Sequence, residues 1–125
     1  MVAHHQIMFK ISNPTEYDDA VEFCRRAVSE DITDLRRETT SLFNFFTERV
    51  GDIVDLNLDY FPEMIVVTFV QHQDVLKALS NRDPHAWRYK GTSTLKNSKE
   101  MREWNFSASK VDFICHVRNC QFADD

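Results

Sequence analysis

Glycine is scarce in this sequence, since Gly51 and Gly91 are the only two among 125 residues. Phosphate-binding loops, dinucleotide-binding turns and the nucleophile elbow of hydrolases all need clustered glycines, because a side chain would block the sharp turn or the close approach of the backbone to a phosphate. The sequence therefore excludes these three kinds of site. It contains no other catalytic motif, and we expect no cofactor.

Cysteines and long apolar runs are also few. Three cysteines are an odd number, which is not typical of a disulfide framework. Cys24 and Cys115 fall on the apolar faces of predicted elements, and we expect them to be buried and reduced, whereas we expect Cys120 to be exposed. No apolar run approaches the roughly 20 residues of a membrane span, and the N-terminal segment lacks the pattern of a signal peptide. We expect a cytoplasmic protein that does not bind a membrane.

Apolar and charged residues are present in ordinary proportions, with 42% hydrophobic and 28% charged residues, including ten Phe and two Trp. A chain of this length and composition predicts a single globular domain over residues 1–125. The net charge of −5 is unevenly distributed, because residues 1–63 hold 13 acidic and 6 basic residues while residues 82–118 hold 8 basic and 4 acidic residues. Such asymmetry can mark a surface for a partner.

The stretch from Met64 to Leu79 organises the predicted fold. Apolar and β-branched residues run without a break from Met64 to Phe69 and end at Val70, which predicts a central strand covered on both faces. From Asp74 the apolar residues return at helical spacing. A strand followed at once by a helix that packs back on it predicts a right-handed crossover.

Other elements follow from periodicity and capping. Alternation of apolar and polar residues predicts strands over 6–11, 53–60 and 111–117. Asn13 and Pro14 begin a helix, and residues 32–50 form either one further helix or two helices divided at Ser41. In the strand over 53–60 the residues expected to face the core are Val54, Leu56, Leu58 and Tyr60.

The resulting order, βαββαβ, resembles that of ferredoxin-like domains. This resemblance in topology implies an α+β sandwich with a four-stranded antiparallel sheet of order 4-1-3-2, an extra helix at about 32–50 and a partly helical insertion at about 82–108. RNA-recognition domains share this order but present aromatic side chains on their two central strands. The corresponding positions here offer no aromatic ring: Gln6, Met8, Lys10, Val66, Thr68 and Val70. This open face could pair with a second copy in a homodimer or be covered by the helix over 32–50.

The segment 82–106 interleaves aromatic and cationic residues and is the candidate binding segment. Aromatic rings stack on bases and cations neutralise phosphates, while Trp and Arg are also frequent anchors of protein interfaces. In the alternative interpretation Trp87, Trp104 and Phe106 fold inward as a lid on the core, which we favour for at least two of them. The candidate partner-binding residues are Trp87, Arg88, Tyr89, Lys90, Lys96, Lys99, Arg102 and Trp104.

These observations favour a non-catalytic binding or regulatory protein that acts through a protein partner, with RNA or other nucleic acid as a second class of partner at segment 82–106. The alternative is a small enzyme or ligand-binding domain with a pocket between the sheet and the helices. There His116, together with Asp112 or Tyr89, would transfer protons. No C-x-x-C or H-E-x-x-H spacing points to a metal.

Overall fold

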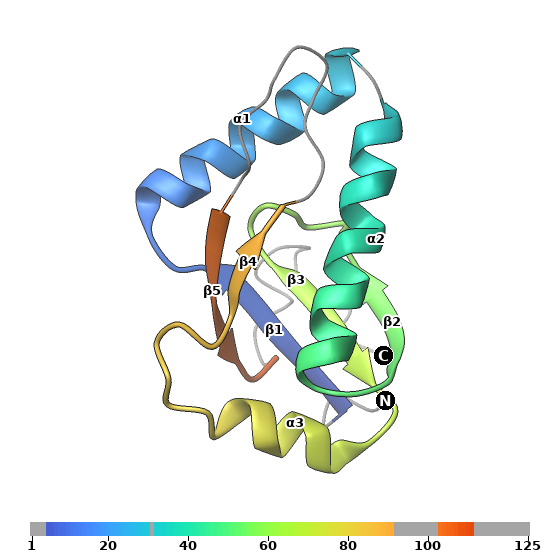
Figure 1. Cartoon of the computed structure of the whole chain (residues 1–125), viewed down its shortest axis with the longest axis vertical. Helices are drawn as coiled ribbons and strands as arrows, with labels where there is room; N and C mark the ends of the chain where they lie inside the picture. The colour runs from blue at the N-terminus through green and yellow to red at the C-terminus, as the bar shows by residue number, and fades with distance from the viewer. Residues whose placement is uncertain (1–4, 31, 92–102, 112–125) are drawn as a thin grey trace, which may run out of the picture.

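The computed structural model describes residues 5–30, 32–91 and 103–111, which form three helices and one five-stranded antiparallel sheet (Figure 1). The α+β class expected from the sequence is therefore confirmed. In chain order the elements are β1 (Gln6–Ile11), α1 (Pro14–Glu30), α2 (Ile32–Arg49), β2 (Ile53–Asn57), β3 (Ile65–Phe69), α3 (His72–Leu79), β4 (Arg88–Lys90) and β5 (Glu103–Ser109).

The strands lie in the order β2-β3-β1-β5-β4, and every neighbouring pair is antiparallel. Ile7 of β1 lies opposite Val67 of β3, and Ile11 lies opposite Phe106 of β5. β3 lies inside the sheet, as its unbroken apolar sequence predicts, because Ile65 and Val67 pack on one face while Val66 packs on the other.

The ferredoxin-like sheet of four strands is not confirmed, because the strand count and order differ. The second neighbour of β1 is β5 rather than a strand over 111–117, and β4 adds a fifth strand. β5 forms because Trp104, Phe106 and Ala108 alternate with polar residues, the pattern of a half-buried strand. Within the insertion that was predicted to be partly helical, Arg88–Lys90 and Glu103–Ser109 are extended. Beyond residue 111, the predicted strand lies outside the described residues.

Two predicted helices are found as expected. The Glu16 amide donates to Oδ1 of Asn13 at 3.0 Å, so Asn13 caps α1 and Pro14 occupies its first position. α2 is a single helix rather than two, and Ser41 lies in its middle. An apolar stripe at helical spacing continues past Ser41 through Leu42, Phe45 and Phe46, and its burial outweighs the weak helix propensity of the hydroxyl residues before it.

The edge strand β2 contains a β-bulge that the alternating sequence did not predict. Ile53 pairs with Phe69 and Asp55 with Thr68, so Val54 is the extra residue between them. Because of the bulge, Ile53 and Leu56 both pack against the core although they are three residues apart. The prediction that Val54 faces inward is therefore wrong, and its side chain is 65% exposed.

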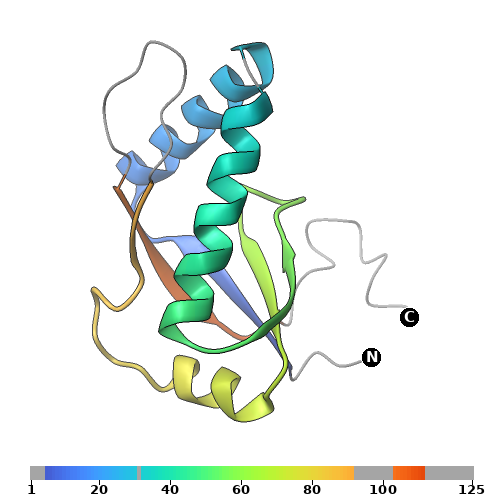
Figure 2. The ribbon, with the colours of Figure 1, turned by 45° about the vertical axis from the view of Figure 1, so that its right-hand side comes forward.

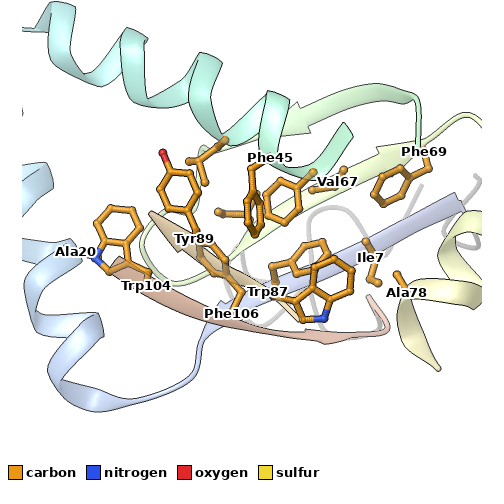
Figure 3. Packing of buried hydrophobic residues seen from close by; sticks show 14 of the residues in the cluster. Ile7, Ala20, Phe45, Val67, Phe69, Ala78, Trp87, Tyr89, Trp104 and Phe106 are labelled. Atoms are coloured by element: carbon orange, nitrogen blue, oxygen red, sulfur yellow. The ribbon is translucent and has the colours of Figure 1, made fainter. Parts of the chain in front are cut away.

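The sheet curls around α2, so that both of its edges approach this helix (Figure 2). At one edge of the sheet β2 contacts α2. At the other edge the ring centroid of Tyr89 in β4 lies 5.3 Å from the ring centroid of Phe45 in α2. In the centre of this curl Phe46 of α2 packs on Phe9 of β1, with the two ring centroids 4.4 Å apart. Side chains from all three helices and from the concave face of the sheet thus share one core (Figure 3).

The opposite face of the sheet carries a second, smaller cluster of buried residues. Met8, Tyr60, Met64 and Val66 form it, with Val111 packed against them. The helix over 32–50 was one of two expected covers for this face, and that expectation is wrong. α2 packs on the concave face instead, because Leu42, Phe45 and Phe46 all belong to the main core.

Candidate functional site

The aromatic residues of segment 82–106 lie in the core, not on the surface. Trp87 is 6% exposed, Tyr89 1% and Trp104 0%, and Figure 3 shows all three between the sheet and the helices. The inward-folding interpretation is thus confirmed for Trp87, Trp104 and Phe106. A base cannot stack on these rings unless the core opens, so they provide no stacking platform.

The cationic members of the segment have a different placement. Arg88 and Lys90 are exposed and alternate with buried Tyr89, so they project from the convex face of β4. Arg88 Nη2 lies 2.9 Å from Nδ1 of His85, and Lys90 Nζ lies 3.9 Å from a carboxylate oxygen of Glu103. The remaining predicted site residues, Lys96, Lys99 and Arg102, lie outside the described residues, as do His116 and Asp112.

Two hydrogen bonds, one of them fully buried, fix the β4–β5 ribbon to the helices. The Tyr89 hydroxyl donates to Glu38 of α2, which is 1% exposed, and Nε1–H of Trp104 donates to Oδ2 of Asp19 of α1 at 2.8 Å. In both residues the polar group of the aromatic ring is hydrogen-bonded, while the rest of the ring packs in the core. The Tyr89–Glu38 bond ties β4 to α2, and the Trp104–Asp19 bond ties β5 to α1.

These two acidic partners were missed by sequence reasoning, although one signal was available. Glu38 lies four residues before Leu42 and seven before Phe45, which places it on the apolar stripe of α2. A carboxylate at such a position is expected to have a buried hydrogen-bond donor. Only the fold identifies that donor as Tyr89, 51 residues later.

β4 is an outermost strand of the sheet, and among the described residues no strand pairs with its outer edge. Phe106 N–H donates to the carbonyl of Trp87 at 3.0 Å, which sets the antiparallel alternation: the backbone groups of Trp87 and Tyr89 face β5, and those of Arg88 and Lys90 face away. The Arg88 amide donates to the carbonyl of His85. The Arg88 carbonyl and both backbone groups of Lys90 are left facing the open edge.

A groove of about 480 Å³ separates this part of β4 from α2. The rings of Phe45 and Tyr89 line it, and polar side chains line the remainder. The α2 residues involved recur every three to four positions, so they form one continuous face of the helix. The lining residues are Thr40, Ser41, Asn44, Phe45 and Glu48 of α2 and Tyr89 and Lys90 of β4.

The charges near this groove are of both signs. Lys90 and Glu48 line it, and the guanidinium of Arg49 lies 4.5 Å from the centroid of the Phe45 ring, a cation–π contact. Arg88 adds a further cation beyond Lys90 on the convex side of β4. The groove thus offers polar and aromatic walls beside a strand edge with two exposed cations.

Other titratable groups in the described part of the chain show no catalytic arrangement. Burial raises the pKa of the Cys24 thiol to about 11, which makes it a poor nucleophile at neutral pH. The hydrogen bond from Tyr17 to Glu63 raises the pKa of the tyrosine. Three or more His, Cys, Asp or Glu side chains do not gather as a metal site anywhere in the described ranges. Within the same ranges, none of the helices is both long and apolar enough to cross a membrane.

Comparison of the chain with protein-family models, with curated proteins and with solved structures gave no match in any of the three.

Proposed function

We propose that this protein is a non-catalytic interaction module that binds an extended, acidic segment of a partner protein along the open edge of β4. The observation that carries the proposal is the outward-facing backbone of Arg88 and Lys90 beside the α2 groove. Addition of a peptide strand to a sheet edge is a recurrent mode of peptide recognition, in which backbone hydrogen bonds give affinity and alternate side chains give specificity.

The backbone of β4 provides the pairing. Three groups are directed to the open edge: the Arg88 carbonyl, the Lys90 amide and the Lys90 carbonyl. A partner strand supplies the matching donors and acceptor. Each such hydrogen bond contributes about 1 kcal/mol net, so a three-residue edge supports weak, reversible binding unless side chains add to it.

The side chains of β4 set the chemistry of the partner. Residues of the added strand that lie beside Arg88 and Lys90 share the convex face with them, where an acidic residue is favoured across the strands. The residue beside Tyr89 points to the concave face and into the groove, where it meets Ser41, Asn44 and Phe45. The preferred segment therefore alternates acidic residues with small polar or β-branched ones.

A fluorescent peptide of alternating Glu and Thr tests this proposal by fluorescence anisotropy. The matched controls are a Lys–Thr peptide of equal length and a Glu–Thr peptide with N-methylated backbone on alternate residues. We expect the Glu–Thr peptide to bind, the Lys–Thr peptide to bind more weakly, and N-methylation on the edge that pairs with β4 to abolish binding. Equal affinity of the methylated and unmethylated peptides would overturn strand addition, because charge alone would then account for binding.

Variants at Lys90 separate the backbone from the charge. Lys90→Pro removes an amide that faces away from β5, so the β4–β5 hydrogen bonds remain and only the edge loses a donor. We expect at least a fivefold loss of peptide affinity, since one hydrogen bond is worth about 1 kcal/mol. Lys90→Thr retains the amide and is expected to lose only the preference for acidic residues.

Nucleic acid is the competing partner, because Arg88 and Lys90 belong to the basic segment 82–118. A labelled single-stranded oligouridylate in the same assay distinguishes the two. Binding of the oligonucleotide that weakens steeply with salt, without binding of the Glu–Thr peptide, would replace the proposal with a nucleic-acid interface. In the enzyme alternative His116 acts with Asp112 or Tyr89. Tyr89 is engaged with Glu38 in the core, and His116 and Asp112 lie outside the described residues.

A further inference from the structure

A second cavity, of about 460 Å³, has a lining that shares no residue with the α2 groove. It is bounded by the end of α3, the connection from α3 to β4, and β5, which come together in the lower part of Figure 1. Its volume falls within the range of about 300–1,000 Å³ that is usual for small-molecule sites. The lining residues are Ser12, Ala78, Leu79, Asn81, Arg82, Asp83, Pro84, Trp87, Asn105, Phe106, Ser107 and Ala108.

One wall of this cavity is apolar and rigid. Trp87 and Phe106 are almost fully buried, and the Trp87 ring packs edge-on against Phe9 at 5.1 Å, so the wall belongs to the core itself. Leu79 and Ala108, both partly buried, continue the same wall. A flat apolar group in the cavity would bury surface against side chains that are already held in place.

The lining of the cavity also carries polar groups that the described residues do not use. Arg82 is exposed and has no ion pair within the described ranges, and the Nε1–H of Trp87 has no acceptor there. Nδ2 of Asn105 donates to the carbonyl of Pro84 at 2.9 Å, while Oδ1 of the same amide is buried and accepts no hydrogen bond from the described residues. Polar groups of this kind are ordinarily satisfied by a ligand or an ordered water.

The turn that holds Arg82 is fixed by local hydrogen bonds. Oδ1 of Asn81 accepts from the Asp83 amide and Oδ1 of Asp83 accepts from the His85 amide, each at 2.9 Å. Arg82 is therefore carried on an ordered connection at the rim of the cavity. Asp83 is the one acidic residue in the lining, and its charge disfavours a doubly charged anion more strongly than a singly charged one.

We infer that this cavity binds a small monocarboxylic acid with a flat or branched apolar body. The body packs against Trp87 and Phe106, and the carboxylate pairs with the guanidinium of Arg82, which is suited to bidentate contact with a carboxylate. This inference does not depend on the peptide site, because the two cavities share no lining residue.

Phenylacetate and its neutral counterpart phenylacetamide are matched probes, and inorganic phosphate tests whether charge alone suffices. The readout is the pair of indole N–H resonances in a ¹⁵N spectrum of the full chain, assigned with Trp87→Phe. We expect millimolar phenylacetate to give a saturable shift of the Trp87 resonance. The Trp104 resonance stays in place, since its N–H already donates to Asp19 and Trp104 does not line the cavity. Phenylacetamide is expected to bind more weakly and phosphate not at all.

Arg82→Gln tests the charge, and it is an exposed position at which folding is not at risk. We expect it to weaken phenylacetate binding about tenfold, as for loss of one charge-assisted hydrogen bond, and to leave phenylacetamide binding unchanged. The absence of a saturable Trp87 shift in the parent protein, or equal binding of the acid and the amide, would overturn the inference. Phosphate binding that disappears in Arg82→Gln would also overturn it, by showing a nonspecific anion site.

Discussion

The two edges of the sheet are built differently, although each is a short strand beside α2. β2 is interrupted by the bulge at Val54 and bears the acidic residue Asp55, with Asp52 directly before the strand. β4 has a regular register with β5 and bears Arg88 and Lys90. A bulge and like charges both discourage the pairing of an edge with another strand. Only β4 combines an uninterrupted backbone with a groove for the side chains of an added strand.

The difference teaches that charge alone does not define an open edge. Lysine on an edge strand also limits self-association, so the cations of β4 keep two copies from pairing through this edge while leaving it open to an acidic strand. At β2 the bulge distorts the outward-facing backbone, so this edge offers no regular row of hydrogen-bonding groups to a partner strand. The comparison can be tested by changing each edge and the residues that support it.

The largest effect is expected from Trp104→Ala, which removes the support of the β4 edge. Trp104 is fully buried, contacts the rings of Phe23 and Phe61, and binds Asp19. We expect removal of such a side chain to lower the free energy of unfolding, measured in urea, by about 3–5 kcal/mol. Val54→Ala at the β2 edge is the control and is expected to change the free energy of unfolding by less than about 0.5 kcal/mol. A comparable loss at both positions would contradict the burial on which the comparison depends.

A smaller loss of stability is expected from Tyr89→Phe, which removes the hydroxyl that ties β4 to α2. The Glu38 carboxylate is buried and loses a donor, so we expect a cost of about 1–3 kcal/mol. Glu38→Gln retains an acceptor for the hydroxyl and is expected to cost less. If Tyr89→Phe were as stable as the parent in urea, the bond would not fix the width of the groove.

The β4–β5 ribbon is also where sequence reasoning was least complete. The central strand β3 and the start of α1 were predictable because each depends on local signals, an unbroken apolar run and an Asn-Pro cap. β4 has only three residues, too few to show a period. Its extended conformation depends on pairing with β5, thirteen residues further along the chain, and no local pattern contains that information.

The candidate site was predicted in part. Arg88 and Lys90 are exposed as a binding role requires, but the aromatic residues interleaved with them face the core. An alternating aromatic–cationic sequence fits both a surface platform and a strand with one buried face, because the period of two is the same. The open edge and the α2 groove depend on the curl of the sheet, which follows from contacts between residues far apart in the sequence.

A third prediction concerns pH and helix α1, which carries both Tyr17 and Cys24. In the folded protein the pKa of Cys24 is raised by burial and that of Tyr17 by its hydrogen bond to Glu63 in the β2–β3 turn. A group whose pKa is raised in the folded state holds its proton more tightly there than in the unfolded chain. The stability that Cys24 contributes in this way is fully present below about pH 9 and is lost as the pH rises through about 11. Urea unfolding of the parent, Tyr17→Phe and Cys24→Ala between neutral and alkaline pH measures this. Each variant should show a shallower alkaline loss than the parent.

The smallest effect on stability, with the sharpest effect on binding, is expected from charge reversal at the β4 edge. Arg88→Glu with Lys90→Glu changes two exposed side chains, of which Lys90 pairs with the exposed Glu103 and Arg88 contacts His85. We therefore expect the free energy of unfolding in urea to change by less than about 1 kcal/mol. Strand addition predicts that the variant then prefers the Lys–Thr peptide to the Glu–Thr peptide, while N-methylation still abolishes binding. The corresponding reversal at β2, Asp52→Lys with Asp55→Lys, should create no peptide binding, because the bulge at Val54 interrupts the backbone that a new strand would need. If the β2 variant bound an acidic peptide as well as the parent protein does, charge rather than backbone regularity would distinguish the two edges.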